Sequence, residues 1–137
     1  MQINAYLNFK GNCKEAFEFY ADVLGAKVEA MIPHTGTPVE AHVPAEWRDK
    51  ILHARIAGNG WVLMGSDAPP GKGEGAAHGF CINIGVNDPQ EADRLFAKLA
   101  ENGSIQMPIQ KTFWATRFGM MTDRFGTPWM INCEEKK

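Results

Sequence analysis

Apolar and polar residues follow two periods along this chain, first alternating and then recurring every three or four positions. Segment 3–9 (INAYLNF) places Leu7 and Phe9 on one face and Tyr6 and Asn8 on the other, which is typical of a half-buried strand. A helical stripe follows, made of Ala16, Phe19, Tyr20, Val23 and Leu24. Strand-like sequence then resumes over 26–32. The pattern therefore predicts a strand, a helix and a second strand.

The second half of the chain repeats this plan. Segment 79–86 (GFCINIGV) alternates, with Phe80, Ile82, Ile84 and Val86 set against Cys81, Asn83 and Gly85. Ala92, Leu95, Phe96 and Leu99 then recur at helical spacing. Because both halves start with the same strand and helix, the pattern indicates an internal duplication.

Both predicted helices carry end signals. Asn12 with Glu15 predicts a capping box, and Gly25 predicts a left-handed end to the first helix. Asp88 predicts the cap of the second helix, with Pro89 in its first position. Gly103 is expected to close that helix.

More strands are expected after each helix. Their predicted ranges are 51–57 and 61–66 in the first half, and 104–111, 113–122 and 127–133 in the second half. Each half thus reads as βαβββ, and the fold class is α+β. We predict a single domain built from module 1 (1–67), a linker (68–78) and module 2 (79–137).

Two segments lie outside this plan. The polar segment 34–50 is longer than most connections, which predicts either a lid or binding loop or a disordered stretch. The Gly- and Pro-rich segment 68–78 is expected to be a linker, since it lacks the spacing of a phosphate loop and the helix that follows one.

Composition excludes several classes of function. A formal net charge of −2 gives no basic face for nucleic acid. The three cysteines, Cys13, Cys81 and Cys133, show neither a disulfide nor a zinc spacing, which indicates a reducing compartment. No apolar run approaches the ~18 residues of a membrane span, and no targeting segment is recognised. We therefore expect a cytoplasmic protein with no membrane or nucleic-acid partner.

Three stretches together cover nearly the whole chain: 5–28, 51–67 and 113–132. In their order and residues they resemble the PhnB-like branch of the vicinal oxygen chelate superfamily, which includes glyoxalase I, fosfomycin and bleomycin resistance proteins and extradiol dioxygenases. The resemblance implies that the two βαβββ modules form a curved mixed sheet that encloses a cleft. It also implies pairing of modules within the chain or across a homodimer.

In the metal-dependent relatives, His or Glu side chains on the first and last strands of the modules bind one divalent ion. The corresponding places here are Tyr6 or Asn8, Met64, Cys81 and Met130. None is a histidine or a carboxylate, and thioethers are poor ligands for a hard cation. We therefore expect no metal and no other cofactor.

His53 is the main candidate for chemistry. By strand alternation it lies, with Arg55, on the face opposite Leu52, Ala54 and Ile56, which should be the cleft. Imidazole can contact a substrate or act as a general base near neutral pH. The alternative, a hydrogen-bonded structural or surface histidine, stays open.

The other histidines lie where solvated side chains are the default. His34 and His42 fall in the long loop, and His78 ends the linker.

Cys81 and Trp114 are further candidates. Cys81 is expected to face the cleft, where a cation such as Arg55 or Arg117 would activate its thiol; the alternative is an inert small hydrophobe. Trp114 is the preferred wall of an apolar pocket, although strand aromatics are more often core residues. Asp67 and Asp123 are expected to be turn formers.

Three functions stay open. The first is a metal-free small-molecule-binding protein of the glyoxalase and bleomycin resistance type. Its ligand-binding residues would be Tyr6, Asn8, His53, Arg55, Cys81, Asn83, Trp114 and Asn132. The second is a lyase- or oxidoreductase-type enzyme on a small oxygen-rich metabolite, with His53 as base and an atypical metal site. The third is a scaffold whose product is its dimer interface. Ubiquinone methyl transfer is rejected, because no Gly-rich strand-turn-helix for a methyl donor is present.

Overall fold

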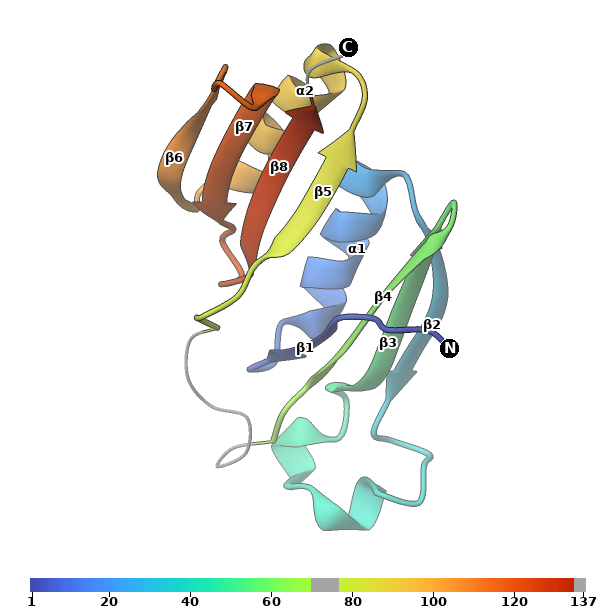
Figure 1. Ribbon diagram of the computed structural model, residues 1–137. Helices are drawn as coiled ribbons and strands as arrows, with labels where there is room; N and C mark the ends of the chain where they lie inside the picture. The colour runs from blue at the N-terminus through green and yellow to red at the C-terminus, as the bar shows by residue number, and fades with distance from the viewer. Residues whose placement is uncertain (70–76, 135–137) are drawn as a thin grey trace. The chain divides into compact units, whose positions relative to one another are not determined.

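The computed structural model describes residues 1–69 and 77–134 (Figure 1). The chain divides into two compact units, unit 1 (Met1–Gly75) and unit 2 (Ala76–Lys137). Most of the predicted linker lies outside the described residues. The α+β class is confirmed, with one four-stranded mixed sheet and one main helix in each unit.

Unit 1 consists of β1 (Tyr6–Phe9), α1 (Cys13–Leu24), β2 (Lys27–Pro33), β3 (Ile51–Gly58) and β4 (Trp61–Asp67). The strand order is β1-β4-β3-β2. β1 runs parallel to β4, and the other neighbours are antiparallel. A parallel pair needs a long crossover, and here α1, β2 and β3 supply it.

Unit 2 repeats this topology with β5 (Ile82–Val86), α2 (Pro89–Ala100), β6 (Ser104–Gln110), β7 (Ala115–Thr122) and β8 (Pro128–Glu134). The order is β5-β8-β7-β6, with β5 parallel to β8 (Figure 1). Every predicted strand and helix is present, and the repeat of one βαβββ plan in the two halves is confirmed.

Each helix packs on one face of its own sheet. Leu7 and Phe9 of β1 are 7% and 4% exposed and lie on the α1 side, as the alternation predicts. In unit 2 the residues beneath α2 include Trp129, Ile131 and Cys133, all nearly inaccessible. Burial of these side chains against a helix is the main stabilising term for each unit. Among the described residues of each unit, the opposite sheet face carries no α-helix, and we call it the helix-free face of that unit.

The helix ends were predicted with mixed success. Gly25 adopts the left-handed conformation (φ 66°), and Asp88 accepts a hydrogen bond from Gln90 N, so both predictions are confirmed. The side chain of Asn12 makes no cap hydrogen bond, so the predicted capping box is wrong. Asp67 takes its place: Oδ1 accepts from the backbone N–H of Gly11 and of Cys13, at 2.8 and 3.0 Å.

A bulge near the start of β3 changes which of its side chains face the helix. His53 pairs with Ile32 and Ile51 pairs with Pro33, so Leu52 is the extra residue of a bulge. Ile51 is therefore buried and Leu52 only half-buried, contrary to the predicted face of Leu52. Beyond the bulge, Ala54 and Ile56 are fully buried as predicted.

The long loop 34–50 folds on itself around two short 3-10 helices, η1 (Glu40–His42) and η2 (Ala45–Trp47). His34 N and His34 Nδ1 both donate to the carbonyl of Lys50, which closes the loop at its base. His34 is only 3% exposed, so the expectation of a solvated side chain is wrong. The alternative of a disordered loop is also wrong.

Among the helices of the described residues, none is long and apolar enough to cross a membrane.

Candidate functional site

The helix-free face of unit 1 collects four of the predicted site residues. Tyr6, Met64 and Arg55 lie directly opposite one another across β1, β4 and β3, and Asn8 lies opposite Ser66. Residues that oppose each other in neighbouring strands share a face, so these side chains form one surface. His53 belongs to it by alternation from Arg55.

Tyr6 and His53 are in direct contact across this face. The Tyr6 hydroxyl and His53 Nδ1 are 3.1 Å apart, and the two rings stack with centroids 5.8 Å apart. A phenol is a better donor than an imidazole N–H, and an imidazole nitrogen is a better acceptor than a phenol oxygen. With Tyr6 as donor, His53 carries its proton on Nε2 and presents an N–H to a ligand.

Arg55 is held by a residue that the sequence analysis missed. Its Nε donates to Glu29 Oε1 at 2.7 Å, and its Nη1 lies 3.8 Å from Met64 Sδ. Glu29 has no register partner because a bulge falls between Val28 and Ala30, and this brings the carboxylate within reach. Among the described residues, Arg55 Nη2 makes no hydrogen bond, and this group is left for a ligand.

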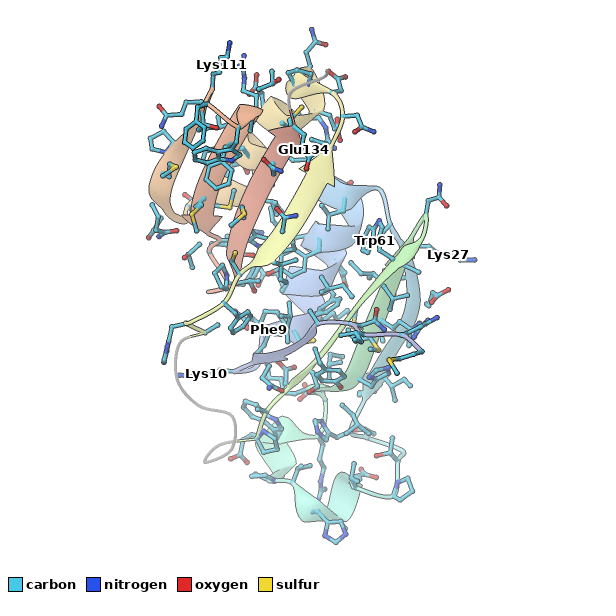
Figure 2. All side chains as sticks on the ribbon, in the orientation of Figure 1. Phe9, Lys10, Lys27, Trp61, Lys111 and Glu134 are labelled. Carbon is cyan, nitrogen blue, oxygen red and sulfur yellow. The ribbon has the colours of Figure 1, made fainter. Side chains whose placement is uncertain are left out.

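The helix-free face of unit 2 carries two rows of residues that cross its four strands in register. One row is Met107, Met120, Met130 and Asn83, and the other is Gln110, Phe118, Asn132 and Gly85. Sulfur-bearing side chains gather over β6, β7 and β8 (Figure 2). None of the eight residues is charged. This face is therefore chemically unlike that of unit 1.

The remaining two candidates lie at the margins of that face. Trp114 precedes β7 and packs its ring on Phe118, with centroids 5.2 Å apart, while Phe113 packs on Trp114. Cys81 is half-buried and immediately precedes β5. Of the two cations proposed to activate it, Arg117 pairs with Asp93 of α2 and Arg55 pairs with Glu29.

The residues at the expected metal places do not fit a divalent cation. Tyr6, Met64, Met130 and Cys81 present a phenol, two thioethers and a single thiol, and Asn83, the register partner of Met130, adds an amide. These groups are not the carboxylate and imidazole ligands of hard or borderline cations. Over residues 1–69 and 77–134, no three His, Cys, Asp or Glu side chains lie close enough together to hold a metal ion.

Asp67 is the other important residue that the sequence analysis misplaced. It is 2% exposed, and besides Gly11 N and Cys13 N it accepts a hydrogen bond from Ile51 N at 2.9 Å. It is therefore not a turn former but joins the ends of β1 and β4 to the starts of α1 and β3. Burial, and second the nearby Asp67 carboxylate, raise the pKa of Cys13 to about 12, so this thiol stays neutral.

Comparison with known proteins finds relatives that match nearly the whole chain. The model of the Glyoxalase/Bleomycin resistance protein/Dioxygenase superfamily matches residues 2–131. Protein YjdN of Escherichia coli K12 is 39% identical over 140 residues, with 96% of this chain and 95% of YjdN covered. The crystal structure of PA1353 from Pseudomonas aeruginosa is 48% identical with a TM-score of 0.91, and 99% of each chain is covered.

A PhnB protein from Bacillus cereus shares the fold, with a TM-score of 0.82 and 22% identity over 97% of this chain and 99% of the other.

Proposed function

Because the chain belongs to the Glyoxalase/Bleomycin resistance protein/Dioxygenase superfamily, we propose that it is a small-molecule-binding protein that works without a metal. The observation that carries the proposal is the Tyr6–His53 pair beside Arg55 on the helix-free face of unit 1. A hydroxyl, an imidazole N–H and a guanidinium edge together suit a small molecule with carboxylate or phosphate oxygens.

A hydrogen bond donated by Tyr6 to His53 would favour binding over catalysis. With Tyr6 donating to Nδ1, His53 Nε2 is a hydrogen-bond donor, whereas a general base needs an unprotonated nitrogen directed at the substrate. A reaction with His53 as base would require the Tyr6–His53 hydrogen bond to reverse. The enzyme alternative, a lyase- or oxidoreductase-type reaction on an oxygen-rich metabolite, therefore ranks second.

The homodimer remains part of the proposal. Strands β1, β2, β5 and β6 are the outer strands of their sheets, and an unpaired strand edge favours pairing with another chain.

Citrate or inorganic phosphate is expected to raise the melting temperature of the protein, since a ligand of the folded state stabilises it in proportion to RT ln(1 + [L]/Kd). Arg55→Ala should weaken citrate binding by about tenfold or more, because a charged hydrogen bond contributes roughly 1.5–3 kcal/mol. His53→Ala should weaken it less. Titration calorimetry with the parent and both variants measures these losses.

Glu29→Gln is the matched control for Arg55. Glu29 competes with a ligand for the guanidinium, so removing its charge should strengthen citrate binding while leaving Arg55 in place. If the parent, Arg55→Ala and Glu29→Gln bind citrate with equal affinity, citrate does not bind at this face of unit 1.

Purified protein is expected to carry no stoichiometric nickel, zinc, iron or manganese, because the donor set does not fit these ions. Elemental analysis measures the content, and chelator treatment should leave the melting temperature unchanged. One transition ion per chain, lost on chelation together with stability, would contradict the proposal and favour the enzyme.

A further inference from the structure

Methionine side chains stand side by side on neighbouring strands of unit 2. Met107, Met120 and Met130 are register neighbours on β6, β7 and β8, and each of these side chains is half-buried. Met121, the next residue along β7, is 0% exposed and lies on the α2 side with its register partner Trp129. Side chains opposite one another in neighbouring strands have Cβ atoms roughly 4.5–5.5 Å apart. The face therefore presents a row of thioethers that a small reagent in solvent can reach.

The thioether sulfur of methionine is open to a two-electron oxidation. Its lone pair attacks an oxygen of hydrogen peroxide, so that an S–O bond forms and the O–O bond breaks. The leaving hydroxide takes up the proton of the transferred oxygen and departs as water. Methionine is oxidised to its sulfoxide, and the peroxide is reduced. A sulfoxide reductase reverses the change, with two thiols oxidised to a disulfide and the oxygen released as water.

Met130 differs from the other two methionines because a hydrogen-bond donor lies beside it. Its register partner in β5 is Asn83, whose side chain is exposed and makes no hydrogen bond to the described residues. The amide of asparagine offers two N–H donors, and a thioether is only a weak acceptor for them. Met107 has Met120 as its register neighbour, and Met120 lies between two thioethers. A sulfoxide oxygen would therefore find a donor in register with Met130 but not with Met120.

We propose that Met130 is a site of reversible oxidation, at which a peroxide converts the thioether to a sulfoxide and Asn83 Nδ2 donates a hydrogen bond to the new oxygen. Asn83 lies on one side of Met130 and Met120 on the other, so this bond favours the sulfoxide epimer whose oxygen is directed toward β5. Oxidation replaces an apolar group of the row by a polar one. The proposal shares no residue with the site proposed in unit 1.

Oxidation by dilute hydrogen peroxide, followed by peptide mass spectrometry with fragmentation, measures the reaction of each methionine. Met130 should be oxidised at least ~10-fold faster than Met121, because the sulfur must be accessible to the oxidant. Met1 is fully exposed and gives the rate of an unprotected methionine. A sulfoxide reductase supplied with a dithiol should return Met130 to the thioether in the folded protein.

Asn83→Leu tests the hydrogen bond, and Asn83→Gln is its matched control because glutamine keeps the donor. Each is combined with Met107→Leu and Met120→Leu, so that Met130 is the member of the row that reacts. In the parent and in Asn83→Gln, oxidation should lower the melting temperature by less than about 2 °C. In Asn83→Leu the sulfoxide loses its donor, and the drop should be larger by roughly 3–5 °C.

The epimer ratio of the Met130 sulfoxide is a second readout, which simple exposure of a methionine would not change. Two sulfoxide reductases each reduce one epimer, so treatment of the digested peptide with either enzyme measures the ratio. The parent should favour one epimer by at least ~3-fold, a modest bias for one hydrogen bond. Asn83→Leu should give nearly equal amounts of the two, and Asn83→Gln should restore the bias.

Four results would overturn the inference. The first is equal oxidation rates for Met130 and Met121, and the second is a Met130 sulfoxide that the reductase does not reduce in the folded protein. The third is an equal drop in melting temperature for the oxidised parent and the oxidised Asn83→Leu variant. The fourth is an epimer ratio near 1 in the parent. If the combined variants fail to fold, the parent and the single Asn83→Leu variant still give the rates and the epimer ratios, because each peptide is measured separately.

Discussion

Replacement of Asp67 with alanine is expected to lower the free energy of unfolding by about 3–5 kcal/mol. The substitution leaves three backbone N–H groups, those of Gly11, Cys13 and Ile51, without their acceptor in a region where Asp67 itself is 2% exposed. Each unsatisfied buried donor costs roughly 1–3 kcal/mol. Chemical denaturation measures the loss, and the melting temperature should fall by roughly 10 °C or more.

Asp88→Ala is the matched control for this experiment. Asp88 also accepts a backbone N–H at the start of a helix, but the bond is a single one at an exposed site. Its loss should cost about 1 kcal/mol. If Asp67→Ala is no more destabilising than Asp88→Ala, Asp67 does not hold the ends of the unit 1 elements together.

Asp123→Ala is expected to have the second largest effect, a loss of about 3–4 kcal/mol. Asp123 Oδ1 accepts from Phe125 N and Thr127 N in the turn between β7 and β8, and Oδ2 accepts from Trp129 Nε1 at 2.8 Å. Trp129 is 1% exposed, so its indole N–H has no access to water. The carboxylate therefore satisfies both the turn and the largest core side chain of unit 2.

Two further variants separate these contributions. Trp129→Phe removes the bond to Oδ2 and keeps the two backbone bonds to Oδ1, so it should cost less than Asp123→Ala although it also changes packing. Thr122→Ala, at the neighbouring position, removes an exposed side-chain hydrogen bond to Gln106 of β6 and should cost under ~0.5 kcal/mol. A loss for Asp123→Ala as small as that for Thr122→Ala would contradict the assignment. Urea unfolding of all three variants gives the comparison.

Local patterns predict much of this fold because they report which face of each element is buried. The alternation that sets Leu7 and Phe9 against Tyr6 and Asn8 also describes the two faces of β1 in the structure. Asp123 was predicted as a turn former from its own sequence neighbourhood, and its bonds to Phe125 and Thr127 confirm it. These are interactions between residues close in sequence.

The misplaced residues depend on contacts that are distant in sequence. Asp67 reaches Gly11 and Cys13 across more than fifty positions, and no local pattern records that pairing. Leu52 does not lie on its predicted face, because a bulge interrupts the pairing of β3 with β2 at this position. His34 is buried because the far end of its loop, at Lys50, folds back onto it.

The candidate site was only partly accessible from sequence for the same reason. Strand parity grouped His53 with Arg55 and set Tyr6 on the face opposite Leu7, and the register of the structure then brings Tyr6 into line with Met64 and Arg55. Strand parity did not reveal Glu29, because Glu29 is the extra residue of a second bulge and reaches Arg55 from there. In unit 2, the rows of Met107, Met120 and Met130 become visible only once the register of β6, β7 and β8 is known.

The central claim is that this protein binds small molecules on the helix-free face of the unit 1 sheet. A citrate titration followed by 1H–15N correlation NMR tests it most directly, because each backbone amide reports its own surroundings. The account predicts saturable shifts centred on Tyr6, Asn8, His53, Arg55 and Met64, with small changes along α1. Absence of saturable shifts in folded protein, or shifts confined to α1, would contradict it.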